Sequence, residues 1–335
     1  MMTRRFLALM LLALPPALFP GQPAAQDKGK LDAAAEETLS AIVRVRAKII
    51  PNARSLATLG PQREGSGVLV RPGYVATIGY LIIEAQTVEV TGADGKSVPA
   101  IVAGYDHASG FGLLKLLAPL GGKPLALGDA RSLGERAPVL AAHYGGSDGV
   151  NLVHVVSRRP FSGSWEYHLD SAIFTYPPVM NWSGASLIGP KGELLGLGSL
   201  IVNDAAGGGT PSPGNLFVPI DLLKPILEDL IARGKASGPV RPWLGVNAEE
   251  ARGRLFVARV SPDSPADKAG LKGGDIVIGV GGEQVSSLEA FYRKVWGRGA
   301  AGVDVPVKVL QGAQVKDLTI RSIDRMEYFR NKSSY

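Results

Sequence analysis

A serine followed by glycine and a small residue, Ser183-Gly184-Ala185, is the feature of this 335-residue sequence that most suggests chemistry. It lies in the stretch MNWSGASLIGPKGELLG, where a loop leads into an apolar turn and a strand-like run. A serine hydroxyl is a weak nucleophile unless a base takes its proton, an acid orients that base, and N–H groups hold the oxyanion. Ser183 is therefore either an activated nucleophile or a polar turn residue.

Short strand-like runs separated by glycine turns precede this serine. The chain contains 43 glycines and 24 prolines and has few strongly periodic helical stretches. This spacing favours an antiparallel barrel or sandwich. Residues 219–236 carry the clearest helical period. Its apolar positions are Leu222, Leu223, Ile226, Leu227, Leu230 and Ile231.

A Gly/Pro-rich linker at residues 234–242 predicts a domain boundary, and a second unit follows it. In this unit we expect strands at 255–260, 276–280, 305–310 and 316–320, and a helix that begins near residue 286. Ser286 and Glu289 have the spacing of a capping box. One face of this helix would carry Leu288, Phe291, Tyr292 and Val295. The charged tail, 324–335, is expected to fray.

The first 25 residues have a basic start, a short apolar run and a small-residue end, which predicts a secretory signal peptide. No later stretch is apolar and long enough to predict a membrane span. The chain has no cysteine and four scattered histidines, so neither a disulfide framework nor a structural zinc site is expected, and no cofactor is predicted. The formal charge of +6 is mild and does not argue for nucleic acid. Export without disulfides fits a bacterial periplasm.

The order of motifs along the mature chain resembles that of HtrA/Deg-type trypsin-like serine proteases. The resemblance rests on Gly65-Ser66-Gly67, then GYVATIGYLII, GYDHASGFGLLKL, LALGDARSLGERAPVLAAHYGG and the Ser183 loop. The segments WLGV and SPDSPADKAGLKGGDIVIGVGGEQV resemble a PDZ domain. The resemblance implies a mostly β fold: a trypsin-like double β-barrel over residues 26–236, followed by a PDZ domain over 240–323.

The sequence departs from this family at the residues that carry its chemistry. In the family a Thr-x-x-His segment supplies the base, whereas the matching segment here is TIGY, with Tyr80 in the histidine's place. An aspartate that opens a strand orients the base, but Gly110 stands at that position. A tyrosine titrates near pH 10 and is a poor proton acceptor at neutral pH, and glycine can orient nothing. The resemblance therefore implies that Ser183 is a relic nucleophile.

Three further features bear on that interpretation. The family's Gly-Asn-Ser-Gly-Gly loop starts here with Asn181, which tolerates strained backbone better than most residues, so the oxyanion hole is expected to be weakened. Residues 170–180 are longer than their family counterpart. No histidine precedes His107, so the usual base is absent in any register. A rearranged triad that uses His107 or Asp106 is the catalytic alternative.

The PDZ-like loop keeps its pattern where the triad does not. A PDZ domain binds a peptide as an added strand, and loop amides hold the terminal carboxylate. The residues that match this peptide-binding loop are Trp243, Leu244, Gly245 and Val246. We expect Trp243 and the helix beyond residue 286 to select the bound side chain. A PDZ fold that serves only as a lid or spacer is the alternative.

These features predict a degenerate, inactive HtrA-like protease homologue that binds exposed segments or C-termini of envelope proteins through its PDZ domain. Its role would be adaptor, regulator of an active relative, or holdase in envelope protein quality control. The competing hypothesis is an active serine endopeptidase that uses Ser183 with a non-standard base. A third is a structural partner in a mixed oligomer. Homo-oligomers and an active protease relative are further expected partners.

Overall fold

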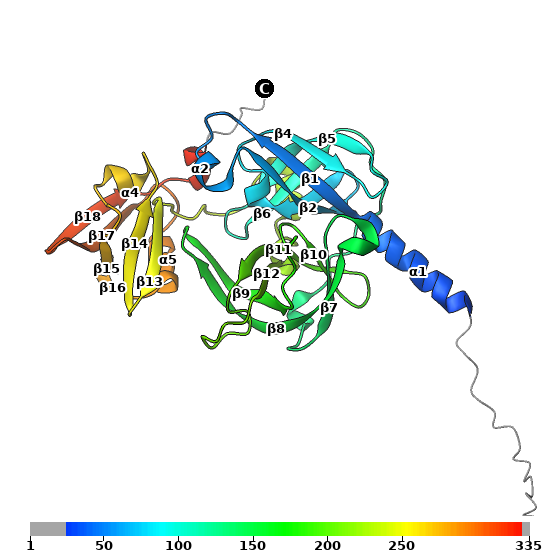
Figure 1. Cartoon of the computed structure of the whole chain (residues 1–335). Coiled ribbons are helices and arrows are strands. Elements are labelled where there is room, and N and C mark those ends of the chain that lie inside the picture. The colour runs from blue at the N-terminus through cyan, green and yellow to red at the C-terminus, as the bar shows by residue number, and fades with distance from the viewer. Residues whose placement is uncertain (1–24, 330–335) are drawn as a thin grey trace, which may run out of the picture.

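A computed structural model describes residues 25–329, and almost all of the expected signal peptide lies outside them. Two closed six-stranded β-barrels lie side by side, with a smaller sheet domain beyond them (Figure 1). This confirms the predicted mostly β fold, with a double barrel followed by a smaller domain. Within residues 25–329, no helix is long and apolar enough to cross a membrane.

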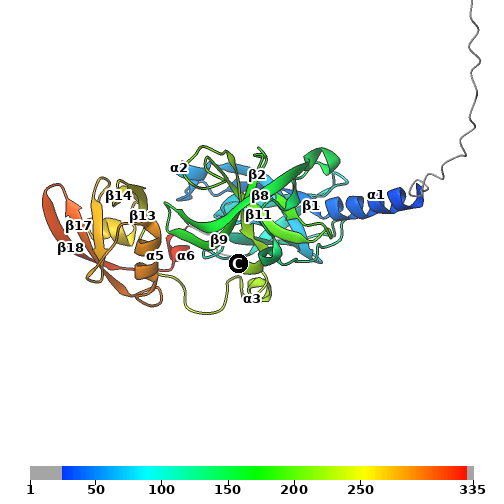
Figure 2. The ribbon, with the colours of Figure 1, turned by 90° about the horizontal axis from the view of Figure 1, so that it is seen from below.

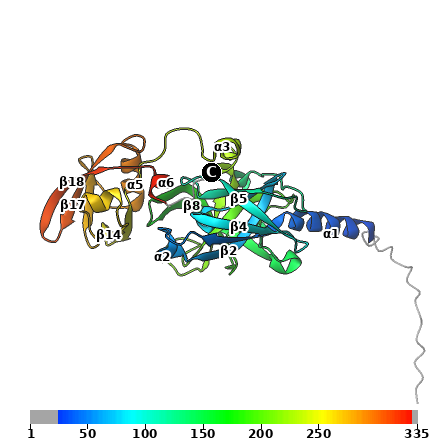
Figure 3. The ribbon, with the colours of Figure 1, turned by 90° about the horizontal axis from the view of Figure 1, so that it is seen from above.

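The first barrel has the strand order β1-β2-β3-β6-β5-β4. Every neighbouring pair is antiparallel, and its short turns match the glycine spacing of the sequence. Its strands are β1 (Ile42–Ile49), β2 (Gln62–Arg71), β3 (Tyr74–Ile78), β4 (Ala85–Thr91), β5 (Ser97–Tyr105) and β6 (Phe111–Leu116). Helix α1 (Ala25–Ser40) precedes the barrel and projects away from it, on the side opposite the smaller domain (Figures 1–3).

The second barrel has the order β10-β11-β12-β9-β8-β7. Its strands are β7 (Pro138–Ala142), β8 (Val150–Gly163), β9 (Tyr167–Tyr176), β10 (Ser186–Ile188), β11 (Leu194–Val202) and β12 (Gly214–Pro219). Strands β8 and β9 are the longest of this barrel and form a hairpin with the tip Ser164–Glu166. Figures 2 and 3 show this hairpin extending toward the smaller domain.

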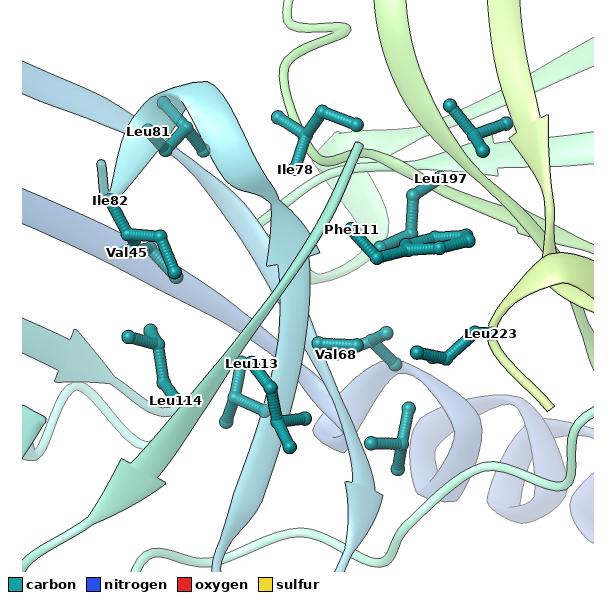
Figure 4. Close-up of a cluster of buried hydrophobic side chains, with 14 of the residues drawn as sticks. Val45, Val68, Ile78, Leu81, Ile82, Phe111, Leu113, Leu114, Leu197 and Leu223 are labelled. Atoms are coloured by element: carbon teal, nitrogen blue, oxygen red, sulfur yellow. The ribbon is translucent and has the colours of Figure 1, made fainter. Parts of the chain in front are cut away.

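A continuous apolar core joins the two barrels. Figure 4 shows Phe111 of the first barrel close to Leu197 and Leu223 of the second. All three side chains are fully buried. Burial of such side chains supplies about 2 kcal/mol each, so the seam between the barrels is a stable place for a site.

The helix predicted at 219–236 is broken into two short pieces. A 3₁₀ turn (Ile220–Leu222) is followed by α3 (Leu227–Arg233), and Leu222 is 39% exposed. Pro225 explains the break, because proline has no N–H to donate and disfavours helical backbone in the residue before it. The apolar period was real, but it spans a turn as well as a helix.

The C-terminal domain is a sheet of order β13-β14-β15-β17-β18, and β16 pairs with β15. Its elements are β13 (Val246–Ala251), β14 (Arg254–Val260), α4 (Pro265–Lys268), β15 (Ile276–Val280), β16 (Glu283–Gln284), α5 (Leu288–Trp296), β17 (Asp304–Gln311) and β18 (Gln314–Arg321). The predicted buried face of α5 is confirmed.

Two expectations about this domain were wrong. Ser287, not Ser286, caps α5 and accepts from the Ala290 N–H at 3.1 Å, while Glu289 pairs with Arg293 instead of closing a capping box. The start of the tail does not fray: Asp324 caps α6 (Arg325–Tyr328), which packs back on the molecule. The aromatic residues of this segment explain its order, because they find partners on both domains.

Candidate active site

Ser183 lies at the seam between the barrels, in the turn that leads into β10. Its carbonyl accepts from the Ser66 N–H of β2 at 2.8 Å, which ties the loop to the first barrel. Gly184 donates to the Gly198 carbonyl at 2.8 Å and has φ +74°. These bonds hold the backbone of the Ser183 loop against both barrels.

Tyr80 caps the serine hydroxyl. It lies in the 3₁₀ turn after β3 (Gly79–Leu81), and its Oη is 2.9 Å from Ser183 Oγ and 2.9 Å from the Ser199 carbonyl oxygen. A phenol has one hydrogen to donate, and a carbonyl can only accept. Both contacts are therefore satisfied when Tyr80 donates to Ser199 and accepts from Ser183.

A tyrosine in this state cannot act as a general base. Burial raises the pKa of Tyr80 to about 12, against the opposing effect of its hydrogen bond to Ser183. At neutral pH the phenol is therefore neutral and already holds its proton. It can accept a hydrogen bond from Ser183, but it cannot remove the proton and leave an alkoxide-like nucleophile.

Another tyrosine lies against the position expected for the orienting carboxylate. Gly110 accepts from the Gly79 N–H at 2.8 Å, so it does lie beside the Tyr80 turn. It has φ +82°, and a Cβ atom built there would be 3.2 Å from the Tyr167 hydroxyl. Tyr167 donates to the Ser109 carbonyl at 2.6 Å and is buried. A side chain at residue 110 would meet both backbone strain and this ring.

The rearranged triad is not formed, because both of its candidate residues are engaged elsewhere. Asp106 accepts from the N–H and the hydroxyl of Ser109, and so closes its own turn. His107 has Nε2 3.0 Å from Met326 Sδ, and its ring stacks on Phe329 and meets the edge of Tyr105. These contacts tie His107 to the C-terminal segment.

His107 makes the fold sensitive to acid. Burial lowers the pKa of His107 well below its usual value near 6.5, and the positive charge of Arg325 lowers it further. Below about pH 6.5 the His107 imidazole takes up a proton in the unfolded chain but stays neutral in the folded chain. The free energy of unfolding must therefore fall as the pH falls.

We predict that wild type loses up to about 1.4 kcal/mol of stability per pH unit more than His107→Phe between pH 6.5 and 5. Chemical denaturation at a series of pH values measures this difference. His154→Gln, at an exposed position, is the matched control and should keep the wild-type slope. Parallel slopes for wild type and His107→Phe would contradict the assignment.

Sequence reasoning missed His143, which the fold brings to the edge of the site. Its Nδ1 lies 2.8 Å from the Tyr144 carbonyl oxygen, and its Nε2 lies 3.4 Å from Asn181 Nδ2. The first contact makes Nδ1 the protonated nitrogen, which leaves Nε2 to face the amide. The backbone of Asn181 does not adopt the strained, positive-φ conformation considered for this position, since it is not among the described residues with positive φ. In the sequence, the only sign that His143 belongs to the site is its place next to the aromatic Tyr144.

The loop that the sequence marks as a candidate peptide-binding loop turns at Gly245, and a carboxylate of the barrel domain contacts it. Leu244 and Val246 are buried, and Gly245 has φ +92°, which exposes consecutive amides to one side. The Glu166 carboxylate of the barrel domain accepts from all three of these N–H groups. Trp243 is buried against Tyr328 of α6, with ring centroids 4.6 Å apart. Glu166 was not foreseen, because nothing local marks it.

Comparisons with known proteins agree with both domains. The trypsin-like peptidase domain family matches residues 65–197, and the PDZ domain family matches 242–321. A probable periplasmic serine endoprotease, DegP-like, of Halomonas elongata is 27% identical over 274 residues, covering 76% of this chain and 55% of the relative. The periplasmic serine endoprotease DegP of Salmonella typhimurium is 28% identical over 252 residues, covering 69% and 51%.

Solved structures show the same fold. The HtrA-type protease AlgW with a tripeptide matches with a TM-score of 0.53 and 20% identity, covering 90% of this chain and 97% of that one. The serine endoprotease from Yersinia pestis matches with a TM-score of 0.52 and 22% identity, covering 91% and 99%. The chain spans about half the length of the curated relatives it matches.

Proposed function

We propose that this chain, which belongs to the HtrA/DegP-type family of trypsin-like serine proteases with a PDZ domain, is a catalytically inactive member. The observation that carries the proposal is the contact between Tyr80 and Ser183, because it puts a neutral phenol where a base would have to stand. Loss of one member of a serine–base pair costs about 10⁶ in turnover, since the group acts as a unit. Here the orienting position is closed as well.

The alternative is an active serine endopeptidase with a non-standard base, and the relatives' names favour it, since they are called serine endoproteases. In this protein the candidate base is His143, whose Nε2 faces the Ser183 loop through Asn181. A histidine in that place would have to break its contact with the Asn181 amide before it could reach the serine.

In the proposed role, the protein binds exposed or C-terminal peptide segments of envelope proteins through its PDZ domain. It acts as adaptor, regulator of an active relative, or holdase. Support comes from the Leu244–Val246 amides, which can hold a carboxylate. Export by a signal peptide at 1–25 and a periplasmic location belong to this proposal, as do a degenerate protease domain at 26–236 and a PDZ domain at 240–323. Relatives named as periplasmic support the location.

Digestion of unfolded casein tests the two alternatives. Wild type, Ser183→Ala and His143→Ala are incubated with casein beside an active relative, and fragments are followed by mass spectrometry. We expect wild type and His143→Ala to release no fragment that Ser183→Ala does not also release. Fragments that wild type releases and Ser183→Ala does not would overturn the proposal, and their loss in His143→Ala would identify the base.

A further inference from the structure

The tip of the β8–β9 hairpin is seated on the C-terminal domain where a PDZ domain takes its ligand. Glu166 Oε1 is 2.6 Å from the Gly245 nitrogen and 2.8 Å from the Val246 nitrogen, and Oε2 is 3.0 Å from the Leu244 nitrogen. Both carboxylate oxygens thus accept from the loop whose amides would hold a peptide's terminal carboxylate.

The backbone of the tip also pairs with the domain as a bound strand would. The Ala248 N–H of β13 donates to the Ser164 carbonyl at 3.0 Å. Ser164 precedes Glu166 by two residues, and Ala248 follows Val246 by two. The two contacts therefore share one antiparallel register, in which Glu166 stands at the terminal position of a ligand and Ser164 two residues before it.

Helix α5 closes the other side of the tip. The Tyr292 hydroxyl donates to the Gly163 carbonyl at 2.6 Å and accepts from the Glu166 N–H at 3.1 Å. Arg325 of α6 donates to the Trp165 carbonyl at 3.1 Å. The tip is therefore held by β13, α5 and α6 together, and Glu166 is only 7% exposed.

Ordinary packing between domains does not require this arrangement. A buried carboxylate is costly, and burial raises the pKa of Glu166 while the three N–H donors oppose that shift. Glu166 also has φ +56°, a region that non-glycine residues rarely adopt. A strained, buried carboxylate aimed at three consecutive amides is accounted for if it replaces a ligand's own carboxylate.

We propose that the Ser164–Glu166 tip is an internal ligand of the PDZ groove, so that a peptide with a free C-terminal carboxylate binds only by displacing it. This inference rests on the proposed peptide-binding function of the same groove. An internal competitor lowers apparent affinity by the fraction of molecules in which the groove is open. If that fraction is about one in a hundred, removal of the competitor tightens binding about 100-fold.

Amide hydrogen exchange on the full chain tests the occupancy without any peptide. In wild type the amides of Leu244, Gly245, Val246 and Ala248 should exchange slowly. Glu166→Ala should make these amides exchange faster, while the Gly184 and Gly198 amides in the barrel stay protected. Glu64→Ala, which removes an exposed carboxylate far from the groove, is the matched control. Unchanged exchange at the loop in Glu166→Ala would overturn the internal ligand.

Fluorescence anisotropy then measures binding of a labelled peptide made of residues 158–165 and a C-terminal valine. Its carboxamide form serves as the control. We expect Glu166→Ala to bind the carboxylate form about 10- to 100-fold more tightly than wild type, and the carboxamide form poorly. Equal affinity in wild type and Glu166→Ala would contradict displacement.

The outcomes separate the two proposals. Faster exchange in Glu166→Ala without carboxylate-dependent binding would support the internal ligand and overturn the peptide-binding function. Tyr292→Phe provides a second variant, because it keeps the buried ring and loses only the hydroxyl bonded to the tip. It should shift exchange and affinity in the same direction by a smaller factor, so a failure of Glu166→Ala to fold leaves the test intact.

Discussion

Tyr80→His combined with Gly110→Asp is expected to leave the protein without Ser183-dependent proteolysis and to lower its stability by about 2–3 kcal/mol. The two substitutions restore the family's residue types but not their geometry. Residue 110 has φ +82°, and its Cβ would be 3.2 Å from the Tyr167 hydroxyl. An aspartate there is therefore strained and is not expected to reach the position from which it would orient a histidine at residue 80. Casein digestion and chemical denaturation measure the two effects.

Gly95→Asp is the matched control for the stability loss. Gly95 has φ +78° and open space around its Cβ position, so it reports the backbone strain alone, about 1 kcal/mol. The single variant Gly110→Asp is compared with Gly95→Asp, and its excess loss of stability belongs to the contact with Tyr167. Serine-dependent digestion by the double variant would show that the site kept its catalytic geometry and had lost only two residue types.

Gly184→Ala is expected to destabilise the barrel domain by about 3–5 kcal/mol, or to prevent its folding. Gly184 has φ +74°, and a Cβ there would lie 1.9 Å from the Ser66 carbonyl oxygen. That carbonyl also accepts from the Thr77 hydroxyl at 2.7 Å, so the backbone cannot simply move aside. The loss is structural and should appear equally in a Ser183→Ala background.

Gly73→Ala separates the backbone strain at positive φ from the steric contact with the Ser66 carbonyl oxygen. Gly73 has φ +77° in the β2–β3 turn of the first barrel, with nothing within 4 Å of its Cβ position. It should lose only about 1 kcal/mol. A Gly184→Ala variant no less stable than Gly73→Ala would show that the Ser183 loop is looser than its contacts indicate.

The sequence was a good guide wherever local pattern sets structure. Short strand-like runs between glycine turns predicted the barrels, and the apolar face of α5 was predicted residue by residue. The resemblance placed Tyr80 in the position of the family's base, and the structure brings its hydroxyl to Ser183. Pro225 was a local sign that the helix predicted at 219–236 would break, but the prediction followed the apolar period instead.

What the sequence could not predict depends on contacts between distant segments. Glu166 and the PDZ-like loop are about 80 residues apart, and a lone glutamate in a hairpin carries no sign of its partner. His107 was a candidate base because no histidine precedes it and it lies close to Gly110 in the sequence. In the fold its ring instead contacts Met326 and Phe329, from the far end of the chain. His143 was passed over because only the fold brings it beside Asn181.

The β8–β9 hairpin contacts both the PDZ-like loop and the surroundings of Gly110. Glu166 reaches the PDZ loop, and the next residue, Tyr167, fills the space beside Gly110. A ligand that displaced the tip would therefore act on a segment that also lies beside Gly110.

Intact-mass analysis after treatment with a fluorophosphonate tests the central claim most directly, because such a probe bonds covalently only to an activated serine. Full-length wild type, Ser183→Ala and an active relative are treated in parallel. The account predicts complete labelling of the relative and no added mass on wild type or Ser183→Ala. One added probe on folded wild type, absent from Ser183→Ala, would contradict it and show that Ser183 is still a nucleophile.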